Sequence, residues 1–329
     1  MPCYLLHGKR VVLSFAWPGL VEAAAGADAD IAFMFDGCCD PLALPSLTEP
    51  GWIEVPLDKR AHATAARLWC QATPDGVRHL IRFSGGDDHA EFVIAADTGR
   101  VGVVWTRPEA QMGDLVHLAL GPVLGLILRL EGQVTLHAGA VAMGGCAVAI
   151  AGPSGSGKST LVAHLIQHGG TLLSDDMSVI VAGTNSPLVL PGQGGVKLWP
   201  QSLEHLGEAL SDWPTIFDSA KRHIQFEPAV SIAPVPLSAI LLLGGFTPGI
   251  EDPVLERLSP REAFLALAAE LYLPFVPLRP AGQAILFQRQ CLVASRVPIL
   301  RALRPRGLDA LPDLSRTIVE EIFNDTRRS

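Results

Sequence analysis

One stretch constrains this chain more than any other part of its sequence: Gly152-Pro153-Ser154-Gly155-Ser156-Gly157-Lys158-Ser159. It matches the pattern G-x-x-x-x-G-K-[ST], whose glycines let the backbone curl around phosphate oxygens and present its N–H groups to them. In this pattern Lys158 reaches the β- and γ-phosphates, and the Ser159 hydroxyl ligates Mg²⁺. An apolar run precedes the loop, and a helical pattern with Thr160 in its first turn follows it. The sequence therefore predicts a site for ATP, or another nucleoside triphosphate, with Mg²⁺.

Two adjacent carboxylates, Asp175 and Asp176, come at the end of the next predicted strand, 171–173. An aspartate in this place can lie beside the metal and the γ-phosphate. Successive side chains of a strand point to opposite faces, so both carboxylates reach one site only if the chain turns there. One could hold Mg²⁺ through water while the other accepts a proton from an attacking hydroxyl. The alternative is a solvated turn at the strand end.

Three further residues are candidates for the same site. His137 lies in a predicted strand, 133–142, that forms a hairpin with 146–151 and so leads into the loop. Its imidazole could approach the γ-phosphate or the acceptor, although a core histidine with satisfied hydrogen bonds is the simpler reading. Lys197 and Arg222 could contact phosphate or substrate, although basic residues of this kind are more often solvated surface groups.

Composition favours a folded chain without a surface for nucleic acid or membrane. Hydrophobic residues make up 49% of the chain and charged residues 18%, which argues against disorder. The net charge of −8 leaves no basic footprint for nucleic acid or an anionic membrane. The longest apolar run, 115–128, is too short to span a bilayer and predicts a buried helix. With no secretory signal and no CxxC pair, we expect a cytoplasmic protein with reduced thiols and no membrane insertion.

We expect a mixed α/β chain of two domains. Residues 1–107 carry short apolar runs between turn signals and predict a small β-rich N-terminal domain, with a helix around 61–70. Residues 108–329 predict the domain that holds the phosphate loop, beginning with a helix over about 108–130. A capping box at Ser259 opens a further helix there. The helices expected in the second domain are 158–168, 200–210, 259–272 and 308–323, and its later strands are 179–182, 187–190, 237–243 and 297–303.

The stretch from Leu136 to Ile180 resembles the HPr kinase/phosphorylase family. A His-containing apolar strand, a phosphate loop after a hairpin and an early pair of aspartates occur in the order and spacing of that family. The segment 196–200 and the β-rich N-terminal half look like a branch found with ribosomal peptide pathways. Some members of this branch phosphorylate lasso-peptide precursors at a C-terminal serine.

The resemblance implies a P-loop kinase core of the HPr kinase and phosphoenolpyruvate-carboxykinase-like type, which phosphorylates a hydroxyl of a peptide or small protein. Carried over by position, Asp175 would be the general base and Asp176 the Mg²⁺ partner, with His137 assisting at the phosphoryl site. The residues alone leave the order of the two aspartates open. Bifunctional members carry an acidic residue where this chain has Thr160, and their Glu-x-Arg-Gly segment has no clear match, which disfavours phosphorylase action. Members of that type are hexamers, so the resemblance also implies that this chain could form a homo-oligomer.

Three functions stay open at this point. The first is an ATP-dependent serine kinase acting on a peptide, most simply a lasso-peptide precursor. The second is an HPr-type protein serine kinase/phosphorylase with the same core. The third is a nucleotide-gated binding module that transfers no phosphate. The phosphate loop fits all three, whereas the adjacent carboxylates favour transfer, because a pure switch needs no proton acceptor.

Overall fold

The computed structural model describes residues 1–17, 20–23, 28–35, 49–56, 65–85, 88–106, 112–207, 215–216, 219–225, 233–274 and 276–324. By its internal contacts the chain divides into two compact units. The first comprises Met1–Leu130 with Phe275–Leu278, and the second Glu131–Pro274 with Arg279–Ser329. The predicted boundary between 107 and 108 precedes the long helix, whereas this division falls after it.

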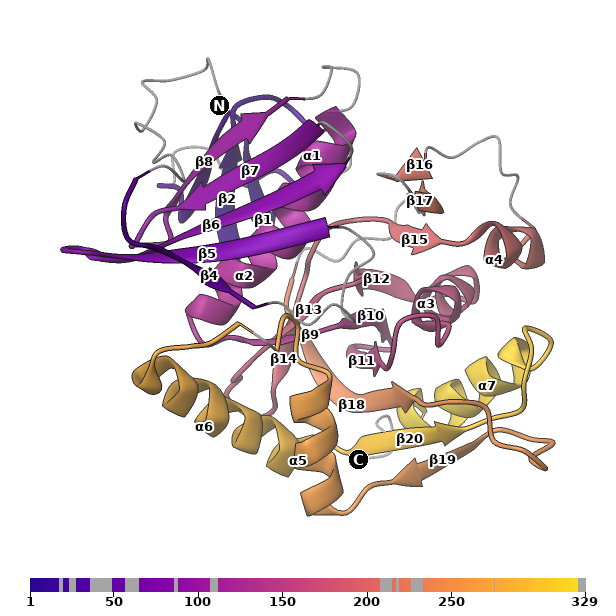
Figure 1. Cartoon of the computed structure of the whole chain (residues 1–329). Helices are drawn as coiled ribbons and strands as arrows, with labels where there is room; N and C mark the ends of the chain where they lie inside the picture. Colours follow the sequence, from indigo (N-terminus) through magenta and orange to yellow (C-terminus); the bar gives the residue numbers. More distant parts are fainter. Residues whose placement is uncertain are drawn as a thin grey trace. The chain divides into compact units, whose positions relative to one another are not determined.

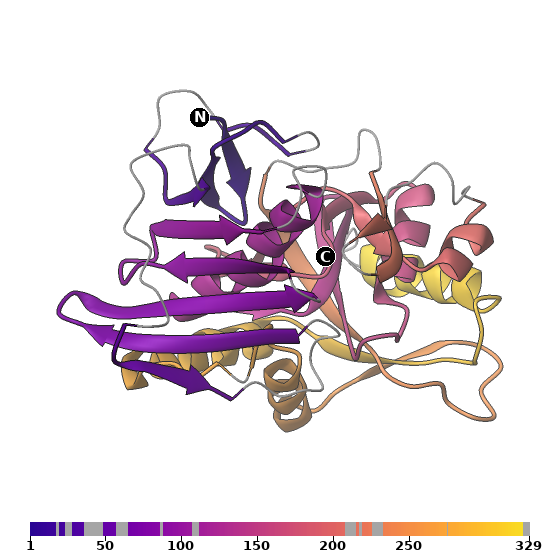
Figure 2. The ribbon, with the colours of Figure 1, turned by 45° about the horizontal axis from the view of Figure 1, so that its top comes forward.

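The first unit is built on one eight-stranded sheet in the order β1-β2-β3-β8-β7-β6-β5-β4 (Figures 1 and 2). This confirms the β-rich N-terminal part. The strands are β1 (Cys3–Leu6), β2 (Lys9–Leu13), β3 (Ile31–Phe35), β4 (Trp52–Val55), β5 (Ala65–Thr73), β6 (Gly76–Gly85), β7 (Asp88–Ile94) and β8 (Arg100–Trp105).

The helix expected around 61–70 is wrong from residue 65 onward, and 61–64 lie outside the described residues. Strand β5 occupies this stretch and pairs with β6 over its whole length. Cross-strand contacts stabilise it: Arg67 forms a two-pronged ion pair with Glu54, and the guanidinium of Arg67 lies 4.9 Å from the centre of the Trp69 ring. Pairing with neighbouring strands thus outweighs the local helical pattern.

A long helix completes the first unit and confirms the predicted buried helix. It runs through α1 (Met112–Leu118), the π-helical turn η2 (Ala119–Val123) and α2 (Leu124–Leu130). The turn contains Pro122, whose missing N–H the wider turn accommodates. Gly113–Leu130 is long and apolar enough to cross a membrane, with a mean hydropathy of 1.5, but 72% of it is buried within the fold. Core packing therefore accounts for its apolar character.

The second unit is built on a nine-stranded sheet, so the predicted mixed α/β class is confirmed. Its main path runs β12-β10-β11-β18-β14-β13-β9, with β20 beside β18 and β19 beside β20. Strands β11, β18 and β20 are parallel neighbours, so their carboxyl ends meet at one edge. The strands are β9 (Val134–Leu136), β10 (Ala138–Met143), β11 (Cys146–Ala151), β12 (Thr171–Ser174), β13 (Ser178–Val181), β14 (Leu188–Leu190), β18 (Val235–Leu243), β19 (Val254–Arg257) and β20 (Ile299–Leu303).

The predicted hairpin is confirmed as β10 and β11, which turn through Gly144 and Gly145 at φ 62° and 88°. The strand expected over 133–142 is two strands, β9 and β10, which break at His137. Strand β9 pairs with β13 and β10 pairs with β11, so the chain changes partners at this residue. A separate three-stranded sheet consists of β15 (Val196–Leu198), β17 (Ser219–Ile224) and β16 (Thr215–Ile216).

The helices of this unit are α3 (Lys158–Gln167), α4 (Pro200–His205), α5 (Pro260–Ala269), α6 (Pro280–Arg296), α7 (Leu311–Ile318) and the π-helical turn η4 (Val319–Phe323). Helices α3 and α7 share an apolar core with β11 and β18 that includes Leu161, Leu165, Val148, Leu241 and Leu314. The capping box at Ser259 is confirmed. The sequence does not predict helix α6, because its apolar residues lie on all its faces and form no one-sided helical pattern. Ile285 and Phe287 are exposed, for example, whereas Leu286 between them is buried.

Replacing Ser259 with alanine removes the hydroxyl that accepts from the Glu262 N–H at the start of α5, whereas the Ser259 backbone N–H can still donate to the Glu262 carboxylate. We expect the free energy of unfolding to fall by about 1 kcal/mol, the usual loss for an N-cap serine. Urea unfolding followed by circular dichroism measures it. The control is Ser295→Ala, near the end of α6, where the exposed hydroxyl only donates to a carbonyl of its own helix. Equal losses in the two variants would contradict the capping role.

Candidate active site

The phosphate loop joins the end of β11 at Ala151 to the start of α3 at Lys158. Its first glycine, Gly152, has φ 143°, and a Cβ there would lie 2.4 Å from the Leu243 carbonyl oxygen on β18. Gly155 and Gly157 have φ of 79° and 93°, in the left-handed region. Close approach to β18 and the left-handed turns therefore require Gly152 and Gly157, the two glycines that the pattern singles out, and Gly155 between them.

Lys158 lies across the loop and is buried. Its Nζ donates to the carbonyl oxygens of Gly152 at 2.7 Å and Pro153 at 3.2 Å. Burial lowers the pKa of Lys158, against the attraction of nearby carboxylates. The ammonium thus occupies the concave side of the loop and is held there by carbonyls that a phosphate could replace.

Ser159 and Asp175 form the direct link between the loop helix and β12. The Ser159 hydroxyl donates to Oδ1 of Asp175 at 3.0 Å, and the Lys197 backbone N–H donates to Oδ2 at 2.9 Å. Gly139 makes room for this carboxylate, because a Cβ there would lie 3.1 Å from Oδ1 and 2.7 Å from Cγ2 of Val162. Burial raises the pKa of Asp175, although both hydrogen bonds favour its charged form.

Asp176 has φ 69°, and this left-handed turn brings both carboxylates into one region. Its Oδ1 lies 3.5 Å from Nδ1 of His137, and its Oδ2 lies 3.4 Å from Nζ of Lys197. Burial opposes the charge of Asp176, but Lys197, His137 and Lys221 together outweigh burial and hold its pKa well below the usual range. The left-handed backbone conformation of Asp176, which is uncommon for a residue other than glycine, thus places its charged carboxylate next to His137 and Lys197.

The structure brings Lys197 into the site but not Arg222. On β17 neighbouring side chains point to opposite faces, and Lys221 is the cation that acts on Asp176 and Lys158. Its Nζ lies 5.4 Å from the centre of the half-exposed Trp199 ring. Among the described residues, Arg222 forms no hydrogen bond or ion pair with the loop or the aspartates, and its buried Nε has no hydrogen-bond partner.

Two residues that the sequence patterns did not single out contact the loop. Glu270, just after α5, accepts a hydrogen bond from the Gly152 N–H at 3.0 Å. Arg304, just after β20, donates to the Ser156 carbonyl oxygen. Arg304 follows the carboxyl end of a strand that runs parallel to β11. Because ligands of open α/β sheets bind at the carboxyl ends of the strands, this place in the sequence could have identified Arg304 as a candidate. No local signal marks Glu270.

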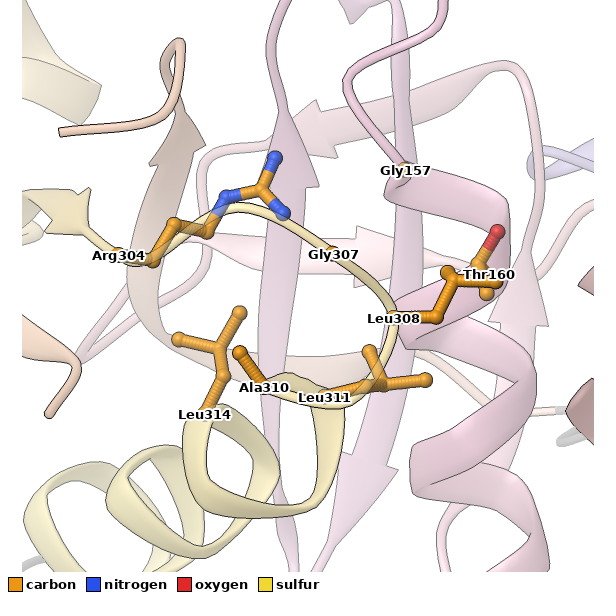
Figure 3. A pocket seen from close by; sticks show the side chains of 8 residues that line it. All are labelled: Gly157, Thr160, Arg304, Gly307, Leu308, Ala310, Leu311 and Leu314. Atoms are coloured by element: carbon orange, nitrogen blue, oxygen red, sulfur yellow. The ribbon is translucent and has the colours of Figure 1, made fainter. Parts of the chain in front are cut away.

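A pocket opens beside the loop, between the start of α3 and the segment that leads from β20 into α7. In Figure 3 the side chains of Arg304 and Leu308 extend from that segment toward α3. Thr160 lies on its α3 side, with its hydroxyl 2.9 Å from that of Ser202. The pocket is lined by Gly157, Thr160, Arg304, Gly307, Leu308, Ala310, Leu311 and Leu314.

The oxygen atoms of Ser159 and Asp175 suit Mg²⁺. A hydroxyl and a carboxylate in contact at the phosphate loop are hard donors of the kind that this ion prefers. Within the described residues there is no group of three or more His, Cys, Asp and Glu side chains that could hold a metal. A magnesium ion here would therefore depend on these two residues, on phosphate oxygens and on water, which is its usual manner of binding in proteins.

Comparison with known proteins adds a likeness to solved structures. No family model and no curated protein matches the sequence. Among solved structures the chain is similar to the Hpr(Ser) kinase/phosphatase from Coxiella burnetii, with 14% sequence identity and a TM-score of 0.31. The match covers 59% of this chain and 99% of that one. A TM-score and an identity this low establish neither a family nor an activity for the chain.

Replacing Lys197 with methionine keeps the side-chain stem and removes the cation nearest to Asp176. We expect the pKa of Asp176 to rise toward its ordinary value, as carboxyl ¹³C NMR titration would measure. A depressed pKa stabilises the folded state above the unfolded pKa, and this contribution is lost as the pH falls through the folded pKa. The variant is therefore less stable than the wild type at neutral pH, and the gap begins to close below about pH 4. Arg306→Met, at an exposed site, is the control, and an unchanged Asp176 titration in Lys197→Met would contradict the ion pair.

Proposed function

We propose that this chain is a kinase that uses ATP and Mg²⁺ to phosphorylate a serine hydroxyl of a peptide or small protein in the cytoplasm. The observation that carries the proposal is the second carboxylate. Asp175 already faces the loop hydroxyl, and Asp176 lies beyond it between His137 and Lys197. A module that only binds nucleotide needs no such group, whereas phosphoryl transfer needs one that receives the acceptor's proton.

The contacts support a division of labour between the aspartates that reverses the order carried over from the resemblance. Asp175 touches Ser159, so these two residues would hold Mg²⁺, which neutralises phosphate charge when bound. Its raised pKa is no obstacle, because a bound cation favours the ionised carboxylate. Among the described residues, Asp176 forms ion pairs with His137 and Lys197 but no hydrogen bond or ion pair with the loop, although its charge acts on Lys158. It is therefore the carboxylate left to meet the acceptor.

In the transfer step, the acceptor hydroxyl loses its proton to Asp176 and its oxygen forms a bond to the γ-phosphorus. The bond from the γ-phosphorus to the bridging oxygen breaks, and ADP keeps that electron pair. Lys158 leaves the Gly152 and Pro153 carbonyls for the phosphates, and Lys197 stabilises the transferred group. A γ-phosphate that draws Lys197 away also raises the pKa of Asp176, which makes it a better proton acceptor as the nucleotide binds.

The acceptor that we propose is the C-terminal serine of a lasso-peptide precursor. The support is the resemblance to that branch, which the segment 196–200 and the β-rich N-terminal half carry. Lys197 and Trp199 of that segment lie at the site and beside it, with Trp199 half exposed. An aromatic side chain and two lysines at the acceptor side suit a peptide end that carries a carboxylate close to its hydroxyl.

The pocket next to Thr160 is the place that we propose for the nucleoside. A triphosphate in the loop directs its nucleoside away from the catalytic aspartates, along the first turn of α3. Arg304 and Leu308 border this path (Figure 3), and the Nε of Arg304 is buried without a hydrogen-bond partner among the described residues. A base that approached this rim would meet both a donor and apolar side chains.

The decisive experiment compares Asp175→Asn with Asp176→Asn. Transfer is followed with γ-labelled ATP and a peptide that ends in serine, and nucleotide binding by calorimetry. We expect Asp175→Asn to bind Mg·ATP at least about tenfold more weakly, because it loses a charged metal ligand. We expect Asp176→Asn to bind Mg·ATP normally and to lose transfer.

The opposite pattern would restore the order that the resemblance implies. Tight binding of Mg·ATP by the wild type with no transfer to peptides or to purified HPr would overturn the kinase proposal in favour of a binding module. Transfer to HPr alone would overturn the peptide acceptor.

Filling the pocket tests the place of the nucleoside. In Ala310→Phe the ring occupies the pocket, and we expect the Kd for Mg·ATP to rise about tenfold while that for inorganic tripolyphosphate with Mg²⁺ stays the same. Pro312→Phe places the same ring at an exposed position outside the pocket lining and serves as control. Equal weakening of both ligands, or of neither, by Ala310→Phe would place the nucleoside elsewhere.

A further inference from the structure

We infer that Glu270 is a positioning residue that holds the entrance of the phosphate loop and the His137 segment in fixed register. The inference rests on the proposed function, because it assigns Glu270 a task in triphosphate binding. Within the described part of the chain, Glu270 forms no hydrogen bond with either aspartate, so it is not placed among the groups that meet the reacting atoms.

The side chain of Glu270 fixes one side of Gly152. Its Oε2 accepts from the Gly152 N–H at 3.0 Å, whereas Lys158 donates to the Gly152 carbonyl at 2.7 Å. The two peptide groups that flank this glycine are thus held from opposite sides. When Lys158 leaves the carbonyl to reach a phosphate, the bond to Glu270 is the one that keeps the loop entrance in place.

The backbone of Glu270 fixes the His137 segment. Its carbonyl oxygen accepts from the His137 N–H at 2.8 Å, and the Tyr272 N–H donates to the Thr135 carbonyl at 2.8 Å. An isolated bridge joins Leu136 to Leu271 between these bonds. This pairing explains why α5 ends at Ala269 although its sequence pattern extends to 272: residues 270–272 run alongside β9 instead.

Helix α5 anchors Glu270 itself. The Glu270 N–H donates to the Ala266 carbonyl oxygen and so ends the helix. The Glu270 backbone is thus held by α5 on one side and by the His137 segment on the other. Its side chain therefore reaches the Gly152 N–H from a fixed position. One residue therefore links three parts that are distant in sequence: the helix, the loop entrance and the strand break at His137.

The test compares Glu270→Gln with Glu270→Ala. Glutamine keeps the length and the acceptor oxygen but loses the charge, whereas alanine loses the bond. Hydrogen exchange of the Gly152 amide in the free protein reads the loop anchor without any ligand, and calorimetry with Mg·ATP reads its consequence. Glu262→Ala, in the exposed capping box of the same helix, is the matched control for a general loss of stability.

We expect Glu270→Ala to exchange the Gly152 amide faster and to raise the Kd for Mg·ATP about tenfold or more, the usual effect of losing a hydrogen bond to a charged group. Glu270→Gln should restore most of each value, because its neutral oxygen keeps the hydrogen bond in a weaker form, and Glu262→Ala should change neither. Unchanged exchange and affinity in Glu270→Ala, or a Glu270→Gln variant as impaired as Glu270→Ala, would overturn the inference. A wild type that shows a protected Gly152 amide but binds no triphosphate would overturn the proposed function and the task assigned to Glu270, while the anchor would stand as a structural contact.

Discussion

The hydrogen bond from the Ser159 hydroxyl to Asp175 is the contact on which the site depends. It joins the first turn of α3, which follows β11, to the end of β12, and in the sheet β10 lies between β12 and β11. Because β11 and α3 are the two sides of the phosphate loop, this bond sets where a carboxylate meets the bound phosphates. This arrangement requires a glycine at position 139, because any larger side chain there would clash with Asp175 and with Val162 of α3.

Further contacts extend outward from this bond. The Lys197 backbone holds the other oxygen of Asp175, and its side chain reaches Asp176, which in turn faces His137. The His137 backbone then leads to Glu270, and Glu270 returns to the first glycine of the loop. The loop, both aspartates, the histidine and the lysine are therefore parts of one connected network. In such a network the loss of one contact affects the others, so the effects of paired substitutions should not be additive.

Much of this site could be predicted because its signals are local. The loop needs its glycines in sequence order, and the hairpin, the following helix and the capping box at Ser259 each have a short signature. What could not be predicted depends on register between distant segments. Side chains alternate between the two faces of β17, so Lys221 and not Arg222 acts on Asp176. The strand breaks at His137 because the chain changes its partner strand there. Glu270 reaches Gly152 only because residues 270–272 pair with β9. Likewise β5 forms a strand because β4 and β6 flank it.

We propose that Ser159 and Asp175, together with the loop, form a site for magnesium and a triphosphate. The most direct test is a crystal structure of the protein with Mg²⁺ and a non-hydrolysable ATP analogue. We expect a metal ion bound by the Ser159 hydroxyl, with Asp175 beside it directly or through water, and Lys158 moved from the Gly152 carbonyl to the phosphates. A triphosphate bound away from the loop, or one bound in it with the Ser159–Asp175 hydrogen bond intact and no metal between them, would contradict it.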